Sequence, residues 1–230
     1  MRRSSFLQAG IFDVEGTLID CVPLQLESWR QTLGAAGHSF TYVNLQPFSG
    51  MDGQWMLDHL LPEESPDYKQ RLLKAQGESY RRDFLCRAQP FPAVRQLFET
   101  LKRDRVLIGI ATTCQKDELA AYNERLNILD LTDSVACGEM VKHGKPDPGL
   151  FQACLSGLQI TDPSRAVAIG DTPYDANAAK KLGMLSAGLI TGGFSEQALL
   201  AAGCDTVFAQ LKDLGDLWHS LADPPIRSTG

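Results

Sequence analysis

The sequence has no excess of basic residues and no long apolar run. Its 230 residues include 22 Lys and Arg against 28 Asp and Glu, which gives a formal net charge of −6. Nucleic acids and anionic membranes are bound by basic surfaces, so we expect neither as a partner. The apolar stretch from Phe6 to Phe12 is interrupted by Gln8 and is too short for a membrane span or for the core of a signal peptide.

The sequence also lacks paired cysteines, because no two of its six cysteines are spaced as CxxC. This spacing argues against a disulfide framework and against a zinc site. We therefore expect a reduced, cytoplasmic protein. With 43% hydrophobic and 22% charged residues, the composition is that of a globular protein. The length allows one large domain, or a large domain with a smaller one.

Short apolar runs alternate with segments that repeat apolar residues at helical spacing. The runs are Leu7–Asp13, Val106–Ala111, Ser134–Cys137, Ala166–Gly170, Met184–Ile190 and a weaker Thr206–Phe208. The helical segments between them are Pro92–Arg103, Lys116–Leu126, Pro148–Gly157, Tyr174–Leu182, Ser195–Ala202 and Leu211–Leu217. This alternation predicts an α/β fold, a Rossmann-like doubly wound parallel sheet with helices on both faces.

One interval, from about Cys21 to Pro90, lacks this alternation. It contains only helical stretches, near Pro23–Ala36, Gly53–Leu61 and Pro66–Cys86, separated by Gly and Pro. We interpret residues 21–90 as a helical cap inserted after the first strand. Residues 1–20 and 91–222 would then form the core, and residues 223–230 a flexible tail.

The first predicted strand ends in two acids, Asp13 and Glu15. Ligands of open α/β sheets bind at the carboxyl edge of the sheet. Because side chains alternate along a strand, both acids can face one ligand, and Gly16 allows the chain to turn away sharply. Such a pair suggests a nucleophile beside an acid/base. The alternative is a pair of polar residues that simply end a strand.

The strand Ala166–Gly170 is also followed by an acid, Asp171, and Asp175 lies at the start of the next helix. Carboxylates about 4 Å apart repel by roughly 4 kcal/mol at an effective dielectric near 20, unless a cation lies between them. Oxygen ligands of this kind suit Mg²⁺. The alternative for Asp171 is a helix N-cap, and for Asp175 a favourable charge near a helix N-terminus.

Polar groups follow two further strands. The hydroxyl of Thr112 and nearby backbone N–H groups could hold a phosphoryl oxygen. Lys145 lies in a Gly/Pro-rich loop, residues 142–148, which would fix its ammonium. Taken alone, Thr112 is typical of a helix cap and Lys145 of solvated surface.

Read in order, these segments resemble the four motifs of the haloacid dehalogenase (HAD) superfamily. They are Asp13-Val14-Glu15-Gly16-Thr17, Thr112, Lys145-Pro146, and Gly170-Asp171 through Asp175. The segments Gly144–Phe151 and Gly170–Met184 are most similar to the phosphoglycolate phosphatase and beta-phosphoglucomutase branch, which also has a helical cap between its first two motifs. The resemblance implies a Mg²⁺-dependent phosphatase that cleaves a small-molecule phosphate monoester through an aspartyl-phosphate intermediate.

The resemblance also implies roles for individual residues. Asp13 would be the nucleophile and Glu15 the acid/base. Asp13, the backbone carbonyl of Glu15 and Asp171 would bind Mg²⁺. Phosphoryl oxygens would be held by Thr112, the N–H of Thr113 and Lys145. Asp175 would anchor Lys145 or metal-bound waters. Gly16 and Gly170 would be supporting residues.

Glu15 departs from the family pattern, since most of these phosphatases carry Asp at this position. The longer side chain moves the acid by about 1 Å or more, and displacement on that scale can cost on the order of 100-fold in rate. Enolase-phosphatases of the superfamily also carry Glu here.

Two alternatives therefore stay open. One is a phosphomutase of the same branch, although Gln25 and Gly53 stand where those mutases carry His and Arg. The other is a binding or scaffold paralogue with impaired catalysis. The partner implied is a small phosphate ester, bound by a monomer or homodimer. Within the cap, Asp52 and Gln54 are candidates for contact with substrate hydroxyls. Trp55 either offers the substrate an apolar face or belongs to the cap core, for which its helical spacing is typical.

Overall fold

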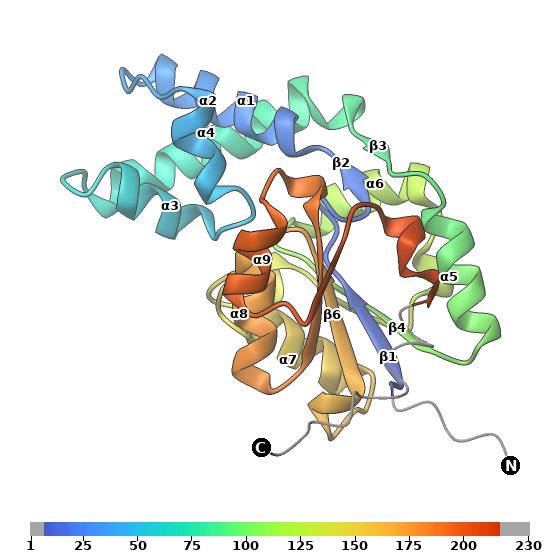
Figure 1. The fold of residues 1–230 in the computed structure, drawn as a ribbon. Helices are drawn as coiled ribbons and strands as arrows, with labels where there is room; N and C mark the ends of the chain where they lie inside the picture. The colour runs from blue at the N-terminus through green and yellow to red at the C-terminus, as the bar shows by residue number, and fades with distance from the viewer. Residues whose placement is uncertain (1–6, 217–230) are drawn as a thin grey trace, which may run out of the picture.

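The computed structural model describes residues 7–216, and its centre is a six-stranded parallel sheet (Figure 1). The strand order is β5-β4-β1-β6-β7-β8. The strands are β1 (Ala9–Phe12), β4 (Leu107–Ala111), β5 (Ser134–Ala136), β6 (Ala166–Gly170), β7 (Leu185–Leu189) and β8 (Thr206–Phe208). All six predicted strands are present, and the predicted doubly wound α/β fold is confirmed. The tail predicted for residues 223–230 lies outside the described residues.

Helices cover both faces of the sheet because successive strand residues are apolar on both sides. Ile11 packs in one core cluster with α7 and α8, whereas Phe12 packs in the other with α5 and α6. The helices of the core are α5 (Val94–Arg103), α6 (Lys116–Leu126), α7 (Gly149–Gly157), α8 (Pro173–Leu182) and α9 (Glu196–Ala202), with short 3₁₀ helices η3 (Leu129–Leu131), η4 (Gly138–Met140), η5 (Pro163–Arg165) and η6 (Ile190–Gly192). Such two-sided burial is typical of parallel sheets.

The last predicted helix, Leu211–Leu217, is wrong in type over its described part. The chain forms a 3₁₀ helix there, η7 (Leu211–Asp216). Gly215 lowers helix propensity by about 1 kcal/mol relative to Ala, which disfavours a regular α-helix over this segment.

A second group of helices lies over the carboxyl ends of the strands (Figure 1). A short antiparallel pair, β2 (Ile19–Asp20) and β3 (Gln89–Pro90), marks where the chain leaves and re-enters the α/β part. Between them lie α1 (Val22–Ala35), α2 (Tyr42–Leu45), η1 (Gln46–Phe48), α3 (Gly53–Leu60), α4 (Pro66–Asp83) and η2 (Leu85–Arg87). We call α1–α4 the cap helices. They enclose an apolar cluster of their own, which includes Leu26, Leu33, Met56 and Leu72.

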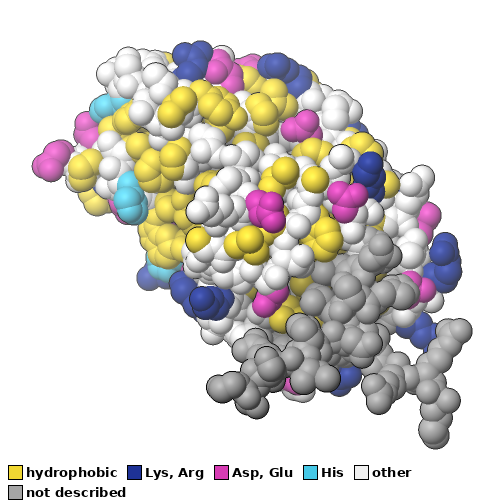
Figure 2. All heavy atoms as spheres, viewed as in Figure 1, with side chains coloured by type: hydrophobic (Ala, Val, Ile, Leu, Met, Phe, Trp, Pro, Cys, Tyr) yellow, Lys and Arg dark blue, Asp and Glu magenta, His cyan; other side chains and the backbone are white. Residues whose placement is uncertain are grey.

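The surface carries no strong segregation of charge on the face that Figure 2 shows. Acidic and basic side chains of the described residues are interspersed there with apolar ones. Within residues 7–216, no helix is both long enough and apolar enough to cross a membrane.

Candidate active site

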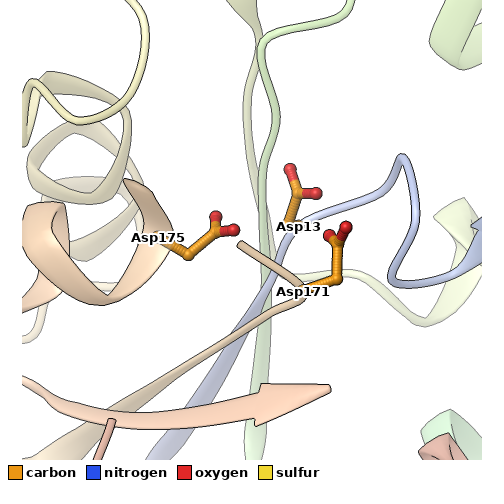
Figure 3. Close-up of side chains that lie close together, drawn as sticks. All are labelled: Asp13, Asp171 and Asp175. Carbon is orange, nitrogen blue, oxygen red and sulfur yellow. The ribbon is translucent and has the colours of Figure 1, made fainter. Parts of the chain in front are cut away.

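The carboxyl ends of β4, β1 and β6 bring the predicted motif residues to one edge of the sheet. Phe12 is paired with Ile110 on one side and with Ile169 on the other. The residues that follow each strand are therefore neighbours, and the N–H of Asp13 donates to the carbonyl of Ile169 at 2.9 Å. Figure 3 shows that the carboxylates of Asp13 and Asp171 lie side by side and that the side chain of Asp175 points toward them.

These three buried aspartates form an oxygen cluster. Each offers one carboxylate oxygen, and the three oxygens lie within 4.8 Å of one another. Asp171 Oδ1 accepts a hydrogen bond from Thr17 Oγ1 at 2.9 Å. Asp171 Oδ2 is buried, and no described residue donates a hydrogen bond to it. A buried carboxylate oxygen without a donor is costly, so this arrangement fits a cation ligand.

The two predicted supporting glycines make room for these carboxylates. A Cβ on Gly16 would lie 2.2 Å from Asp171 Oδ2, and Gly16 also has a left-handed φ of +81°. A Cβ on Gly170 would lie 2.3 Å from Cγ of Asp175. Both distances are far below van der Waals contact, so a larger residue at either position would displace an acid of the cluster.

Lys145 is buried between two of the aspartates. Its Nζ lies 2.5 Å from Asp13 Oδ1 and 2.7 Å from Asp175 Oδ1, and the side chain is only 2% exposed. Burial opposes the charged form, but the two carboxylates outweigh it and raise the pKa of Lys145 above its usual value. Lys145 is therefore a fixed positive charge beside Asp13 and not a solvated surface residue.

The acids keep unusual proton affinities even with Lys145 present. Burial raises the pKa of Asp13 to about 6, although Lys145 acts to lower it. Burial and the charges of Asp13 and Asp175 raise the pKa of Asp171 well above its usual value. When all are ionised, the three carboxylates and one ammonium carry a net charge of −2. The donor set and this charge both fit a divalent, oxygen-preferring cation such as Mg²⁺.

The helix-capping alternatives for Asp171 and Thr112 are wrong. The N-cap of α8 is Thr172, whose hydroxyl accepts from the N–H of Asp175, and the N-cap of α6 is Gln115. Asp175 does lie in the first turn of α8, where its Oδ2 accepts from the N–H and hydroxyl of Thr172. It therefore takes part in the capping box and in the Lys145 ion pair together.

The two threonines after β4 lie beside the first strand. Thr112 is fully buried, its N–H donates to Ala136 and its hydroxyl accepts from the N–H of Cys114 at 3.2 Å. Thr113 is partly exposed and lines the cavity described below. The structure thus brings the Thr112–Thr113 segment to the same sheet edge as Asp13.

Glu15 lies outside the aspartate cluster and faces the cap helices. Its Oε1 accepts hydrogen bonds from Gln25 Nε2 at 2.5 Å and from the Tyr122 hydroxyl at 3.1 Å. Burial, followed by the charges of Glu118 and Asp13, raises the pKa of Glu15 to about 8. No described residue donates a hydrogen bond to its backbone carbonyl, the atom implied as a metal ligand.

Sequence reasoning missed Gln25 and Tyr122 as partners of Glu15. Gln25 stood out only because it replaces a His of the mutases. Tyr122 carried no signal beyond its apolar position in the periodic pattern of α6.

A cavity of about 590 Å³ separates the cap helices from the sheet edge. Its lining includes Glu15, Thr113 and Gly144 from the α/β part, and Trp29, Gln54 and Gln76 from the cap helices. The cavity is large enough for a small molecule, since small-molecule pockets typically span about 300–1,000 Å³.

Two expectations for the cap need correction. The Asp52 carboxylate caps α3 and also accepts from the N–H of Gly144 at 2.7 Å, so its oxygens are used by the protein's own backbone. Trp55 stacks on His143 of the Lys145 loop, with ring centroids 5.9 Å apart, and not within the cap core. Gln54 does line the cavity, where its Oε1 accepts from Gln70.

The comparison with known families matches this geometry. The family model of the haloacid dehalogenase-like hydrolases matches residues 10–189 of this sequence, which contain the whole of the site described above. The chain belongs to this family. As an HAD hydrolase it resembles a phosphorylated carbohydrates phosphatase of Thermotoga maritima, with 29% identity over 86% of this chain and 92% of the relative.

Other relatives agree with this assignment. A phosphoglycolate phosphatase of Mesorhizobium japonicum is 28% identical over 76% of this chain and 78% of its own length. Among solved structures, a hydrolase from Pseudomonas syringae superposes with a TM-score of 0.86 and 27% identity, covering 94% of this chain and all of that one. The protein is thus an HAD-type hydrolase whose relatives include phosphatases of small phosphate esters.

Proposed function

We propose that this HAD hydrolase is a Mg²⁺-dependent phosphatase that cleaves a small phosphate monoester, of the sugar phosphate or phosphoglycolate type, through an aspartyl-phosphate on Asp13. The observation that carries the proposal is the position of Asp13. Its buried carboxylate lies against Lys145 and Asp171 at the carboxyl end of the central strand. The acid Glu15, two residues further on, lines a cavity of suitable size.

The donor set fits Mg²⁺, as the unpartnered Asp171 Oδ2 indicates. Asp13, Asp171 and the backbone carbonyl of Glu15 would hold the ion, and Asp175 is near enough to support it. When bound, Mg²⁺ would offset the negative charge of the phosphoryl oxygens and of the carboxylates.

The residues of the chain would perform two successive displacements at phosphorus. In the first, a carboxylate oxygen of Asp13 forms a bond to phosphorus while the bond to the leaving oxygen breaks, and Glu15 gives that oxygen a proton. In the second, Glu15 takes a proton from water, the water oxygen bonds to phosphorus and the Asp13–phosphorus bond breaks. Lys145, the Thr112 hydroxyl and the Thr113 N–H would hold the phosphoryl oxygens throughout.

We also infer that residues 21–90 act as a cap domain that opens for substrate and closes over it. The chain crosses between the two parts at β2 and β3, so these strands are the natural hinges. Limited proteolysis with and without Mg²⁺ and beryllium fluoride tests this inference. Protection of the β2 and β3 segments supports it, and identical cleavage patterns would contradict it.

Phosphate release from a panel of small phosphate esters, measured with Mg²⁺ and with EDTA, tests the proposed function. We expect release that needs Mg²⁺ and is lost in Asp13→Asn. Glu15→Asp distinguishes the alternatives, because turnover by that variant alone would indicate a native scaffold protein impaired by its longer acid. Isomerisation of a sugar phosphate without phosphate release would indicate a mutase.

A further inference from the structure

A chain of two tyrosine hydroxyls connects the cap helices to Glu15. The hydroxyl of Tyr80 in α4 lies 2.7 Å from that of Tyr122 in α6, and the Tyr122 hydroxyl donates to Glu15 Oε1 at 3.1 Å. A phenol has one proton to donate, so with Tyr122 donating to Glu15, Tyr80 must donate to Tyr122. Both tyrosines are almost fully buried, at 1% and 0% exposed, so water competes little for these hydrogen bonds.

A second chain of hydrogen bonds from α4 ends on the same oxygen. Gln76 Nε2 donates to Gln25 Oε1 at 3.4 Å, and Gln25 Nε2 donates to Glu15 Oε1 at 2.5 Å. Gln76 and Tyr80 are four residues apart and so lie on one face of α4. One helix face of the cap therefore contacts Glu15 through two separate side-chain pairs.

The two carboxyl oxygens of Glu15 differ in their hydrogen-bond partners. Oε1 accepts both hydrogen bonds, whereas none of the residues in the described part of the chain donates to Oε2. The side chain also lines the cavity. One oxygen is thus anchored to the protein, and the other is left for the substrate.

We propose that Tyr122 is a positioning residue that holds the Glu15 carboxyl, and that Tyr80 makes this position depend on the docking of α4. The inference rests on the proposed phosphatase function and adds to it an account of the longer acid. Glutamate has one more rotatable bond than aspartate, and fixing its far end removes conformations in which Oε2 is misplaced. The carboxyl of an aspartate at position 15 would lie about 1 Å further from the Tyr122 hydroxyl than the 3.1 Å of Glu15, which is beyond hydrogen-bonding range.

Steady-state kinetics of phosphate release test the proposal. Tyr122→Phe and Tyr80→Phe each remove one hydroxyl and keep the ring. Tyr68→Phe is the matched control, because Tyr68 lies on α4 with Tyr80 but its hydroxyl donates to the carbonyl of Ala36. We expect Tyr122→Phe to lower kcat about 10-fold and to change KM less than about twofold. Tyr80→Phe should lower kcat about threefold, and Tyr68→Phe should leave kcat within about twofold of the wild type.

The same change in the Glu15→Asp background separates positioning from a structural role. We expect Tyr122→Phe to alter kcat of Glu15→Asp by less than about twofold, because the shorter acid does not reach the hydroxyl. An equal loss in both backgrounds, or an unchanged kcat of Tyr122→Phe, would overturn the proposal. If Glu15→Asp has no turnover, the comparison of Tyr122→Phe with Tyr68→Phe decides.

A crystal structure of Tyr122→Phe gives a readout that needs no activity. The Glu15 carboxyl should leave its wild-type position or occupy several positions, and an unchanged, ordered carboxyl would refute the inference. A wild-type protein that releases no phosphate from any ester would instead contradict the proposed function, and the structural comparison would still test the role of Tyr122.

Discussion

The Lys145 ammonium lies 2.7 Å from Oδ1 of Asp175, whose other oxygen binds the N–H and hydroxyl of Thr172. Asp175 is the third residue of α8 and closes its capping box. The start of this helix therefore fixes a carboxylate, and the carboxylate fixes the ammonium beside Asp13. The Asp175 side chain thus has two roles: it caps the start of α8, and it is a buried negative charge that pairs with Lys145.

We predict that Asp175→Asn lowers kcat by about 10- to 100-fold and destabilises the protein by about 1–3 kcal/mol. The amide keeps the shape and the capping contacts, but Lys145 loses one of its two buried carboxylate partners. Chemical denaturation and phosphate release measure the two effects. Asp162→Asn, at an exposed 3₁₀-helix cap, is the control, and a loss as large in that variant would contradict the explanation.

Much of this site could be predicted from the sequence because parallel strands end at a common edge. Asp13, Thr112 and Asp171 each follow an apolar run, and the register of β1 with β4 and β6 brings them together. The same reasoning gave the six strands and the longer helices. These features depend on local periodicity and on rules of sheet topology.

Other features could not be predicted because they depend on contacts between distant segments. Periodicity places Tyr122 on the buried face of α6 but does not name Glu15, which is 107 residues away, as its partner. Asp52 looks like a free polar residue, yet it binds a backbone N–H that is 92 positions further along the chain. The helix α2 has four residues, too few for a periodic pattern, and only its Thr41–Asn44 capping box marks it.

Mg²⁺ should stabilise the wild-type protein against heat, and Asp171→Asn should lose most of that stabilisation. A ligand that binds only the folded state raises its stability by about 1.4 kcal/mol when present at roughly ten times its dissociation constant. Within residues 7–216, Asp171 Oδ2 is a buried carboxylate oxygen without a donor, so an amide at this position would remove the proposed ligand. Thermal unfolding with Mg²⁺ and with EDTA measures the shift. An equal shift in both proteins, or none in the wild type, would refute the assignment of Asp171 as a ligand.

The wild-type protein should lose unfolding free energy relative to the Glu118→Gln variant as pH rises above about 4.5. Burial raises the pKa of Glu118 above its usual value of 4.5, although the Gln115 N–H and Arg81 oppose this shift. The folded protein therefore holds this proton more tightly than the unfolded chain does. The resulting stabilisation is complete below the unfolded pKa and is lost as pH rises through the folded pKa. A glutamine remains neutral throughout and lacks this dependence.

Urea denaturation of the wild type and of Glu118→Gln at several pH values from 4 to 8 measures the difference between their unfolding free energies. The contributions of the other titrating groups largely cancel in this difference. Glu118 pairs with Arg81 of α4 at 3.3 Å, so the measurement also reports on docking of the cap helices. A difference in unfolding free energy that stays constant would show that the contacts with Arg81 and the Gln115 N–H cancel the cost of burial. A difference that grows in favour of the wild type with rising pH would show that they outweigh it, and either result would contradict the prediction.

Asp52→Ser should separate the capping of α3 from the bond between the cap and the Lys145 loop. The carboxylate uses Oδ1 for the N–H groups of Gln54 and Trp55, and Oδ2 for the N–H of Gly144. Serine can still cap the helix but has no second oxygen for Gly144. We expect unfolding free energy within about 0.5 kcal/mol of the wild type and kcat/KM lowered about 10-fold, because the loop that presents Lys145 loses a contact with the cap.

Asp52→Ala should show the same kinetic loss and a further destabilisation of about 1 kcal/mol. If Asp52→Ser keeps wild-type kcat/KM, the bond to Gly144 does not help to position Lys145, and the Asp52 side chain serves only to cap α3.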